Sequence, residues 1–288
     1  MKKGIVIIAA VMLLIATVFP TTVLADTPGE SGSGDIQTVV YNEYAQIQKL
    51  QAMQDSELIQ LGFTEIQIQG IRDFNYPAAL EERANLPQTE LATMGYSPSE
   101  IVQLKSYDGN SLQAYSLGAT LTLTIDKGTL SNGRYIYNSS SNRTYWQNNY
   151  KWSWSSTPAM MFTDTVGAGW APTMSLYASS STVYYKNYQS GSSAGTVDSS
   201  FALKGTNSAK SGNFDVADYY IKGRYNWAYK GSGYIKVTAA GKKRDLQMNI
   251  AYGHSTWVAT PSISAPLGVG FSFSTNVEKI GQTVQYYY

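Results

Sequence analysis

The chain has 288 residues, with 21 Lys and Arg, 20 Asp and Glu, one His and no Cys. This length is enough to bury a sizeable core. The lack of cysteine excludes disulfides, thiolate catalysis, Cys-based zinc sites and a lipid anchor attached to a cysteine after a signal peptide. One histidine also argues against a histidine-based metal site, and we expect no metal and no cofactor.

The charge is divided between two parts of the chain. Residues 26–112 hold 13 Asp and Glu against 4 Lys and Arg, whereas residues 113–288 hold 7 against 15. Such asymmetry predicts an acidic module and a basic module that have different partners or face each other. We therefore consider intramolecular docking of the acidic part on the basic part, and a related hypothesis in which the acidic part is a prosegment.

Residues 1–25 have the pattern of a secretory signal peptide. Lys2 and Lys3 precede an apolar run at 5–19, which is shorter than the roughly 20 residues that cross a bilayer. Small or apolar residues end the segment, so we expect cleavage after Ala25 and a secreted, extracellular product. Export without cysteine suits a bacterial source. Residues 26–34, rich in Gly and Ser, predict a flexible leader.

Residues 35–112 predict an acidic helical domain. Apolar residues spaced by three and four from Ile36 to Met53 predict its first helix. Segments 56–75 and 89–108 then align without a gap at an offset of 33 residues. In each copy a glycine ends one short helix, and a Thr or Ser with Gln or Glu three residues later caps the next. We expect a small closed bundle, with a protein-docking module as the alternative.

Residues 113–288 predict a basic, Tyr- and Trp-rich β-sandwich domain. Leu121, Leu123 and Ile125 alternate with threonines, and strand-like runs such as 143–154, 214–229 and 246–258 follow at short spacing. All six Trp and 18 of the 23 Tyr lie after residue 112, either as half-buried strand residues or as an exposed aromatic surface. The predicted fold class is α+β in two domains: a small N-terminal helical-repeat bundle followed by an all-β sandwich-like domain.

The tandem L-G-[FY]-[ST]-x-x-[QE]-I helices, followed by the Trp152-x-Trp154 strand, resemble uncharacterised secreted proteins of Gram-positive bacteria. The resemblance covers most of the chain after residue 25. It implies the same order of parts, with helices first and a β-rich C-terminal domain. It implies no activity and carries over no functional residue.

One serine motif matches the pattern of a hydrolase. Residues 191–195 read G-S-S-A-G, and Asp215, Asp218 and His254 follow in the order of an α/β-hydrolase triad. The motif lies in a Ser/Gly-rich run without the following helix that would expose a nucleophile, so we interpret it as a chance match. His254 shares the apolar side of its strand with Ile250 and Tyr252, which indicates a core-edge histidine bonded to a neighbour.

A glycosidase requires two opposed carboxylates. The basic part offers seven acidic residues, and sequence spacing does not place any two of them in one cleft. They are Asp126, Asp164, Asp198, Asp215, Asp218, Asp245 and Glu278. A secreted glycoside hydrolase is therefore only a further alternative. The sequence favours a non-enzymatic protein over an enzyme.

The densest basic run is Lys242-Lys243-Arg244, between two predicted strands. It is either an ordinary solvated turn or a contact for an anionic partner. Outside a bacterium the abundant polyanions are teichoic acids and anionic lipid headgroups, so no nucleic acid is expected. We take these three residues, with Trp152 and Trp154, as the hypothetical ligand-binding set.

These observations predict a secreted, non-enzymatic binding protein whose β domain contacts an anionic or glycan surface of the cell envelope. The alternative is a β-pore-forming or membrane-active, toxin-like protein, because residues 179–213 alternate loosely between apolar and polar residues. The two hypotheses differ in whether the protein makes anionic liposomes leak.

Overall fold

The structure is a computed structural model that describes residues 36–127, 135–187, 190, 193–198, 209–218, 226–243, 245–255, 263–264, 272–273 and 277–287. The predicted signal peptide at 1–25 and leader at 26–34 lie outside these residues, as does Arg244. Within the described part of the chain, no helix is both long enough and apolar enough to span a bilayer.

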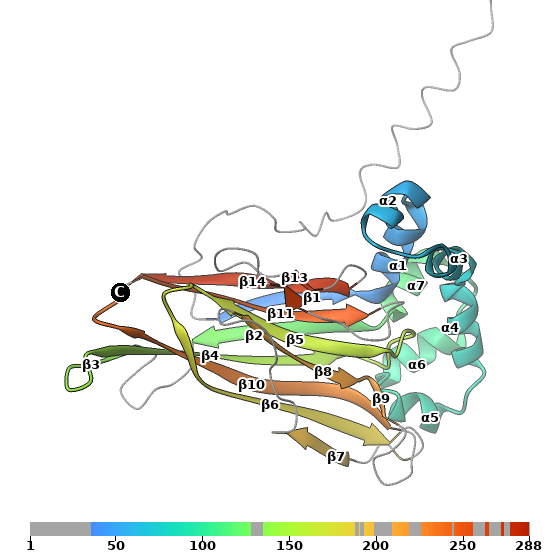
Figure 1. Ribbon diagram of the computed structural model, residues 1–288. Helices are drawn as coiled ribbons and strands as arrows, with labels where there is room; N and C mark the ends of the chain where they lie inside the picture. The colour runs from blue at the N-terminus through green and yellow to red at the C-terminus, as the bar shows by residue number, and fades with distance from the viewer. Residues whose placement is uncertain are drawn as a thin grey trace, which may run out of the picture. The chain divides into compact units, whose positions relative to one another are not determined.

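Two antiparallel sheets stack on each other (Figure 1). The larger sheet has the order β1-β2-β4-β10-β6-β7, with β3 paired to β4 and β9 paired to β10, and the smaller sheet has the order β14-β11-β5-β8. The strands of the larger sheet are β1 (Ile36–Asn42), β2 (Thr120–Lys127), β3 (Tyr135–Asn138), β4 (Arg143–Trp154), β6 (Ser175–Asn187), β7 (Ser193–Asp198), β9 (Ala217–Asp218) and β10 (Asn226–Ala240). The others are β5 (Thr163–Trp170), β8 (Ala209–Asp215), β11 (Asp245–Ser255) and β14 (Val277–Tyr287), with a separate pair formed by β12 (Ile263–Ser264) and β13 (Ser272–Phe273).

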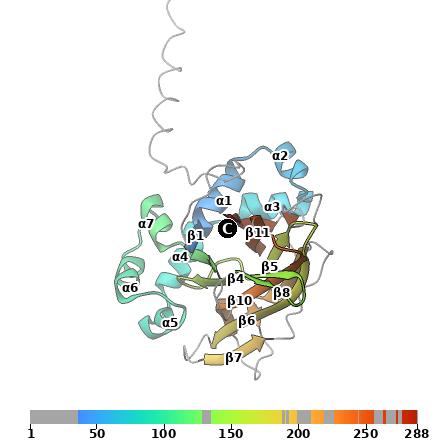
Figure 2. The same ribbon diagram turned by 90° about the vertical axis from the view of Figure 1, so that its left-hand side faces the viewer.

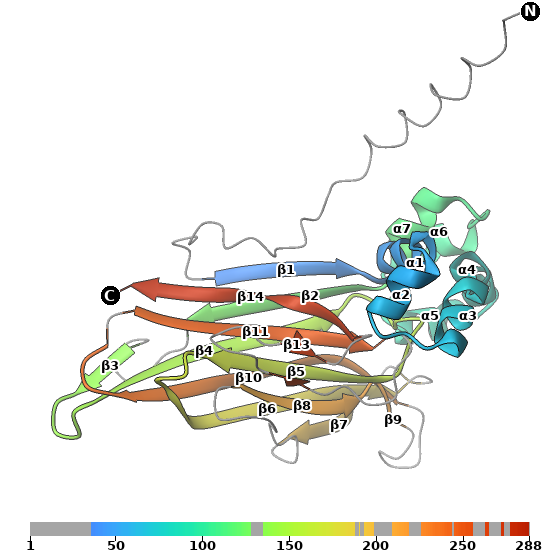
Figure 3. The same cartoon turned by 45° about the horizontal axis from the view of Figure 1, so that its top comes forward.

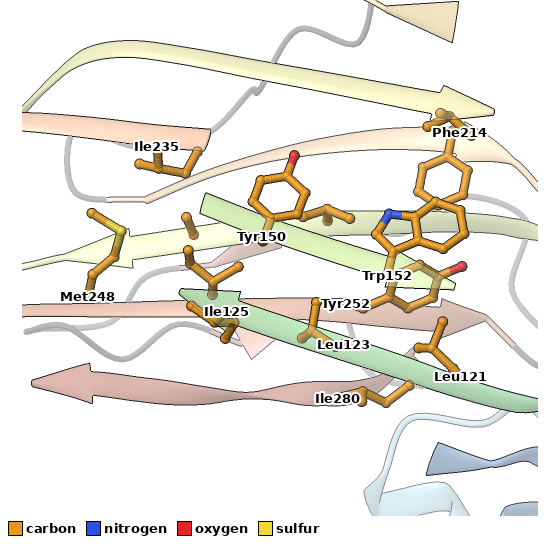
Figure 4. Close-up of a cluster of buried hydrophobic side chains, with 14 of the residues drawn as sticks. Leu121, Leu123, Ile125, Tyr150, Trp152, Phe214, Ile235, Met248, Tyr252 and Ile280 are labelled. Atoms are coloured by element: carbon orange, nitrogen blue, oxygen red, sulfur yellow. The ribbon is translucent and has the colours of Figure 1, made fainter. Parts of the chain in front are cut away.

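Alternating side chains of both sheets form the main core. Along β4, every second residue from Thr144 to Trp154 is buried, as expected for a strand with one face on a core. Figure 4 shows Trp152 between Phe214 and Tyr252, and the Trp152 and Phe214 rings stack with centroids 5.2 Å apart. A Cβ on Gly231 of β10 would lie 2.5 Å from the Trp152 indole, so only glycine lets this ring lie across the strand.

Seven short helices lie within the described residues, all between β1 and β2 in the chain and at one end of the strands (Figure 1). They are α1 (Glu43–Ala52), α2 (Asp55–Gln60), α3 (Glu65–Asp73), α4 (Tyr76–Ala84), α5 (Gln88–Thr93), α6 (Pro98–Lys105) and α7 (Ser111–Leu117). Gly62 and Gly95 have φ values of 83° and 97°, and capping boxes begin α3 and α6. These turn and capping predictions are confirmed.

The predicted fold class is wrong, because β structure dominates and no N-terminal helical-repeat bundle is formed. Residues 36–42, predicted to begin a helix, form β1 and pair with β2 along their full length (Figure 3). The spacing that suggested a helix is outweighed by β-branched residues and by cross-strand pairing with a segment about 80 positions later.

The helices contribute to two apolar clusters: α2 and α3 to one, α4–α7 to the other, and α1 to both, through Leu50 and through Tyr44 and Ile47; Figure 2 shows α1–α3 apart from α5–α7. The first copy of the repeat packs around Leu58 and Ile71, whereas the second packs around Leu91 and Leu104 with Met160 from the loop after β4. The copies therefore share turn geometry without stacking as a repeat, and the helices are an insertion between two strands of the larger sheet.

Candidate functional site

Two groups of charged side chains stand out among the described residues: one is sealed in the interior and the other is exposed. The buried ionic cluster consists of Glu43, Asp164 and His254 with the phenols of Tyr76 and Tyr252. Glu43 begins α1, Asp164 lies on β5 and His254 lies on β11. The cluster therefore joins the helical insertion to the smaller sheet.

His254 lies between two carboxylates. Its Nδ1 atom is 3.1 Å from both carboxylate oxygens of Asp164, and its Nε2 atom is 3.6 Å from Oε1 of Glu43. All three residues have no exposed surface. The interpretation of His254 as a buried histidine bonded to a neighbour is confirmed.

Both carboxylates have further donors, which is required for a buried charge. Asp164 accepts hydrogen bonds from the Ser255 N–H, at 2.9 Å, and from the Tyr252 hydroxyl. Glu43 accepts from the Tyr76 hydroxyl at 3.0 Å and from two backbone N–H groups, those of Ala159 and Met160, at 2.8 Å each. Glu43 therefore holds the loop after β4 against the start of α1.

This environment keeps the imidazole charged. Burial by itself would lower the pKa of His254, but the charge and hydrogen bond of Asp164, followed by those of Glu43, raise that pKa to about 10. Burial, together with the charge of Asp164, raises the pKa of Tyr252 well above 10. The protonated imidazole is therefore favoured between these two acidic side chains, which is a structural arrangement.

The enzyme alternatives gain no site from this cluster. Asp164 and Glu43 flank one histidine, but neither carboxylate reaches the surface, so a glycoside cannot lie between them. Asp215 accepts a hydrogen bond from the Thr163 hydroxyl at 2.6 Å. Backbone is described for only part of the 191–195 serine motif, residues 193–195, which lie in the edge strand β7 (Ser193–Asp198).

The exposed group lies on the outer face, which we define as the outward side of β2, β4, β10 and β6. The outward positions alternate with core residues and carry Thr, Ser, Asn, Tyr and Lys. Register places them in cross-strand rows, such as Thr124–Lys151–Ser232–Thr182 and Asp126–Asn149–Tyr234–Ser180. Such a polar, half-exposed face is typical of an antiparallel sheet that packs on one side only.

Two Lys–Tyr clusters lie at different heights along β10. In the Lys236 cluster, Lys236 Nζ lies 5.0 Å from the ring centre of Tyr177 and 5.7 Å from that of Tyr145. A bulge in the β10–β6 register around Lys236 brings Tyr177 to this position. These distances allow cation–π attraction, which holds the ammonium group over the rings while leaving it open to solvent.

The Lys230 cluster contains two lysines. Lys230 Nζ lies 5.0 Å from the Tyr184 ring centre, and Lys186 Nζ lies 4.5 Å from the Tyr229 ring centre. Partial burial and the neighbouring charge of Lys230 lower the pKa of Lys186. Among the described residues, no ion pair joins Lys186, Lys230 or Lys236 to a carboxylate. An anion placed here would relieve the repulsion between Lys186 and Lys230.

Between the two clusters the outer face has a polar depression of about 370 Å³. Its lining comes from four strands and combines hydroxyl, amide and charged groups with the rings of Tyr150 and Tyr234. The outward lining residues are Asp126, Asn149, Lys151, Ser180, Thr182, Ser232 and Tyr234. Rows of short hydroxyl side chains beside a tyrosine ring provide hydrogen-bonding partners for a polyhydroxylated ligand.

The predicted ligand-binding residues fall in different places. Trp152 and Trp154 are only 2% and 5% exposed, so these rings belong to the core and cannot contact a surface ligand. The alternation of residues along 143–154 predicts a strand but does not show which of its two sides faces the core. Lys242 and Lys243 are exposed in the turn after β10, where Gly241 has a φ of 73°. Arg244 lies outside the described residues.

Sequence reasoning missed the tyrosines of both clusters, and Lys230 and Lys236 were not among the predicted ligand-binding residues. One signal was available. In 226–240, Lys230, Ser232, Tyr234 and Lys236 occupy every second position, which indicates a single outward side. The partners on β4 and β6 depend on register and could not be deduced.

Comparison with known proteins gives no family for this chain: no family model matches, and no curated protein matches. Among solved structures, Clostridium perfringens delta-toxin is 12% identical, with 58% of this chain and 84% of the toxin covered at a TM-score of 0.29. The collagen-binding subdomain of the Enterococcus faecalis surface protein ACE is 10% identical, with coverage of 51% and 89% and a TM-score of 0.26. A collagen-binding domain from a Staphylococcus aureus adhesin is 9% identical, with coverage of 54% and 97% and a TM-score of 0.23. Likeness at these scores carries no argument about this chain.

Proposed function

We propose that this protein is a secreted, extracellular binding protein whose outer face contacts an anionic, hydroxyl-bearing polymer of the cell envelope. The observation that carries the proposal is the outer face itself: Lys186, Lys230 and Lys236 lie over tyrosine rings on both sides of a polar depression. Lysines held in this way attract anions, and the hydroxyl and amide groups between them suit sugars or polyols.

A binding role is supported over catalysis by where the titratable groups lie. The histidine and its two carboxylates are enclosed, and both carboxylates accept hydrogen bonds from protein groups. The outer face offers lysines, tyrosines, short hydroxyl groups and the carboxylate of Asp126, without a described partner carboxylate across the depression. Such a surface can hold a ligand by several weak contacts and contains no opposed acid and base.

The test is retention of the purified full chain on cell walls that carry anionic polymer, at low and at high salt. Retention at low salt that is lost at high salt is expected, because exposed charges are screened beyond about 10 Å at 0.1 M salt. The triple variant Lys186→Gln, Lys230→Gln and Lys236→Gln should lose most of the retention. Equal retention of this variant and the unmodified chain would refute the outer face as the binding surface.

Two controls make the result specific. Lys49→Gln changes an exposed lysine of α1 and should leave retention unchanged. Lys242→Gln with Lys243→Gln tests the basic turn, and a loss confined to this pair would move the site from the outer face to the turn. Dye release from anionic liposomes tests the membrane-active alternative, and leakage at micromolar protein would favour it over the proposal.

A further inference from the structure

The two Lys–Tyr clusters are too far apart for one small ligand. Lys230 and Lys236 are six residues apart on the same strand, β10, which corresponds to about 20 Å. Both point outward, since they pair with Ser153 and Gln147 on the outward side of β4. A ligand that contacts both lysines must therefore be an extended chain that lies along β10.

The region between the clusters has a different chemistry. The depression is lined by one acidic residue, Asp126, and one lysine, Lys151, so it has no excess of positive charge, unlike the two clusters. Within the described part of the chain, the hydroxyl groups of Thr182 and Ser232 and the phenol of Tyr234 make no hydrogen bond to protein. They are open to a ligand's hydroxyl groups. The face thus alternates along β10 between a cationic end, a neutral hydrogen-bonding centre and a second cationic end.

From this layout we propose that the partner is a linear polyol-phosphate or sugar-phosphate chain that lies along β10. Its phosphates contact the Lys236 cluster and the Lys230 cluster, and a hydroxylated unit occupies the depression between them. This inference rests on the proposed function and adds to it the class of polymer, its direction and a minimum length of about 20 Å.

The cations of the two clusters favour phosphate over carboxylate. Both clusters use lysine, which binds phosphate as a point charge, and neither contains the planar fork of arginine that matches a carboxylate in two parallel bonds. A polymer with one charge in each repeating unit also offers neutral hydroxyl groups between its charges, as the depression requires.

The first experiment measures affinity against ligand length, with wall teichoic acid fragments of graded size as the probe. Fragments longer than about 20 Å should bind at least tenfold more tightly than shorter ones, because only they reach both clusters. The same affinity for short and long fragments would overturn the inference and leave the proposed function standing. No binding by the longest fragments would instead refute the proposed function.

A pair of variants locates the contacts. Lys230→Gln and Lys236→Gln should each weaken binding of long fragments severalfold, and each should reduce the length dependence, because one end of the track is lost. Lys49→Gln is the matched control and should do neither. If only one of the two outer-face variants weakens binding, the polymer does not run between the clusters.

The second experiment tests the depression with a polymer that has phosphates but no hydroxyl groups. Thr182→Val with Ser232→Ala should weaken binding of teichoic acid fragments about threefold to tenfold and leave binding of inorganic polyphosphate unchanged. An equal effect on both polymers would overturn the assignment of hydroxyl groups to the depression. Tighter binding of a carboxylated polysaccharide than of teichoic acid at equal length would overturn the assignment of phosphate.

Discussion

The buried ionic cluster and the outer face use charge in opposite ways. In the first, a histidine lies between two carboxylates, every member is buried, and each carboxylate accepts two or more hydrogen bonds. In the second, lysines share one surface, pair with tyrosine rings, and have no described carboxylate partner. The first arrangement fixes one structure, whereas the second leaves attraction available for another molecule. Substitutions in the buried cluster should therefore change stability, and substitutions on the outer face should change binding.

The largest effect is expected from breaking the buried cluster. Asp164→Ala removes the partner of His254 and the acceptor of the Ser255 N–H, which leaves a charge and a donor unpaired in the interior. The free energy of unfolding should fall by about 3–5 kcal/mol. Urea denaturation at pH 7 measures it, with the exposed Asp215→Ala as the control, expected to cost about 1 kcal/mol or less. A loss below about 1 kcal/mol for Asp164→Ala would contradict the role of the cluster.

The next effect is a dependence of stability on pH. Because the pKa of His254 is raised to about 10 in the folded state, its contribution is complete below the unfolded pKa of about 6.5 and is lost as pH rises toward 10. The free energy of unfolding should therefore decline by a few kcal/mol across this window. Denaturant titrations at several pH values measure the slope, and His254→Gln should flatten it. An equal slope in both proteins would show that other groups cause it.

A smaller effect is expected where the core meets β10. Gly231→Ala places a Cβ 2.5 Å from the Trp152 indole and forces that ring to move. Overpacking of this kind costs about 1–3 kcal/mol. The neighbouring change Ser232→Ala, on the outward side, should stay within about 0.5 kcal/mol. Thermal unfolding of the two variants compares them directly, and equal melting temperatures would mean that the indole shifts without cost.

The smallest effect on stability is expected from the outer face. Lys236→Gln removes an exposed charge that has no described ion-pair partner, so the free energy of unfolding should change by no more than about 0.5 kcal/mol. Binding to wall polymer should weaken in the same variant. Urea denaturation and retention on cell walls, measured side by side, test this separation. A variant that loses both together would show that the lysine has a structural role.

Local signals in the sequence predicted much of the secondary structure. The run at 143–154 was predicted as a strand and forms β4 with the same bounds, because its large residues recur with period two. The capping boxes that begin at Thr64 and Ser97 were also visible, since a cap depends on residues three positions apart. Features of this kind need no knowledge of distant parts of the chain.

Features that depend on distant pairing were missed. Residues 36–42 were predicted as helix because their pairing with β2 is not encoded locally. Residues 277–287 were not predicted as a strand, although they pair with β11 as β14, where Gly281 packs against Ala251. Predictions from local pattern therefore fail where a strand is defined by its neighbour.

The candidate site was predicted as a basic, aromatic surface, but the residues predicted for it differ from those of the outer face. The excess of lysine and tyrosine after residue 112 indicated a basic aromatic surface, but Trp152 and Trp154 point into the core. Tyr177 reaches Lys236 through a bulge, which no spacing rule shows. The buried cluster likewise joins Glu43, Asp164 and His254 from three separate elements, so only the burial of His254 could be expected from the sequence.

The strand arrangement also has a consequence for how the protein matures. β1 and β14, the first and last strands described, lie side by side where the two sheets meet (Figure 3). Contacts between such remote segments form late and slowly. The β layers therefore cannot close until residues near 280 have been made, which delays folding of the nascent polypeptide.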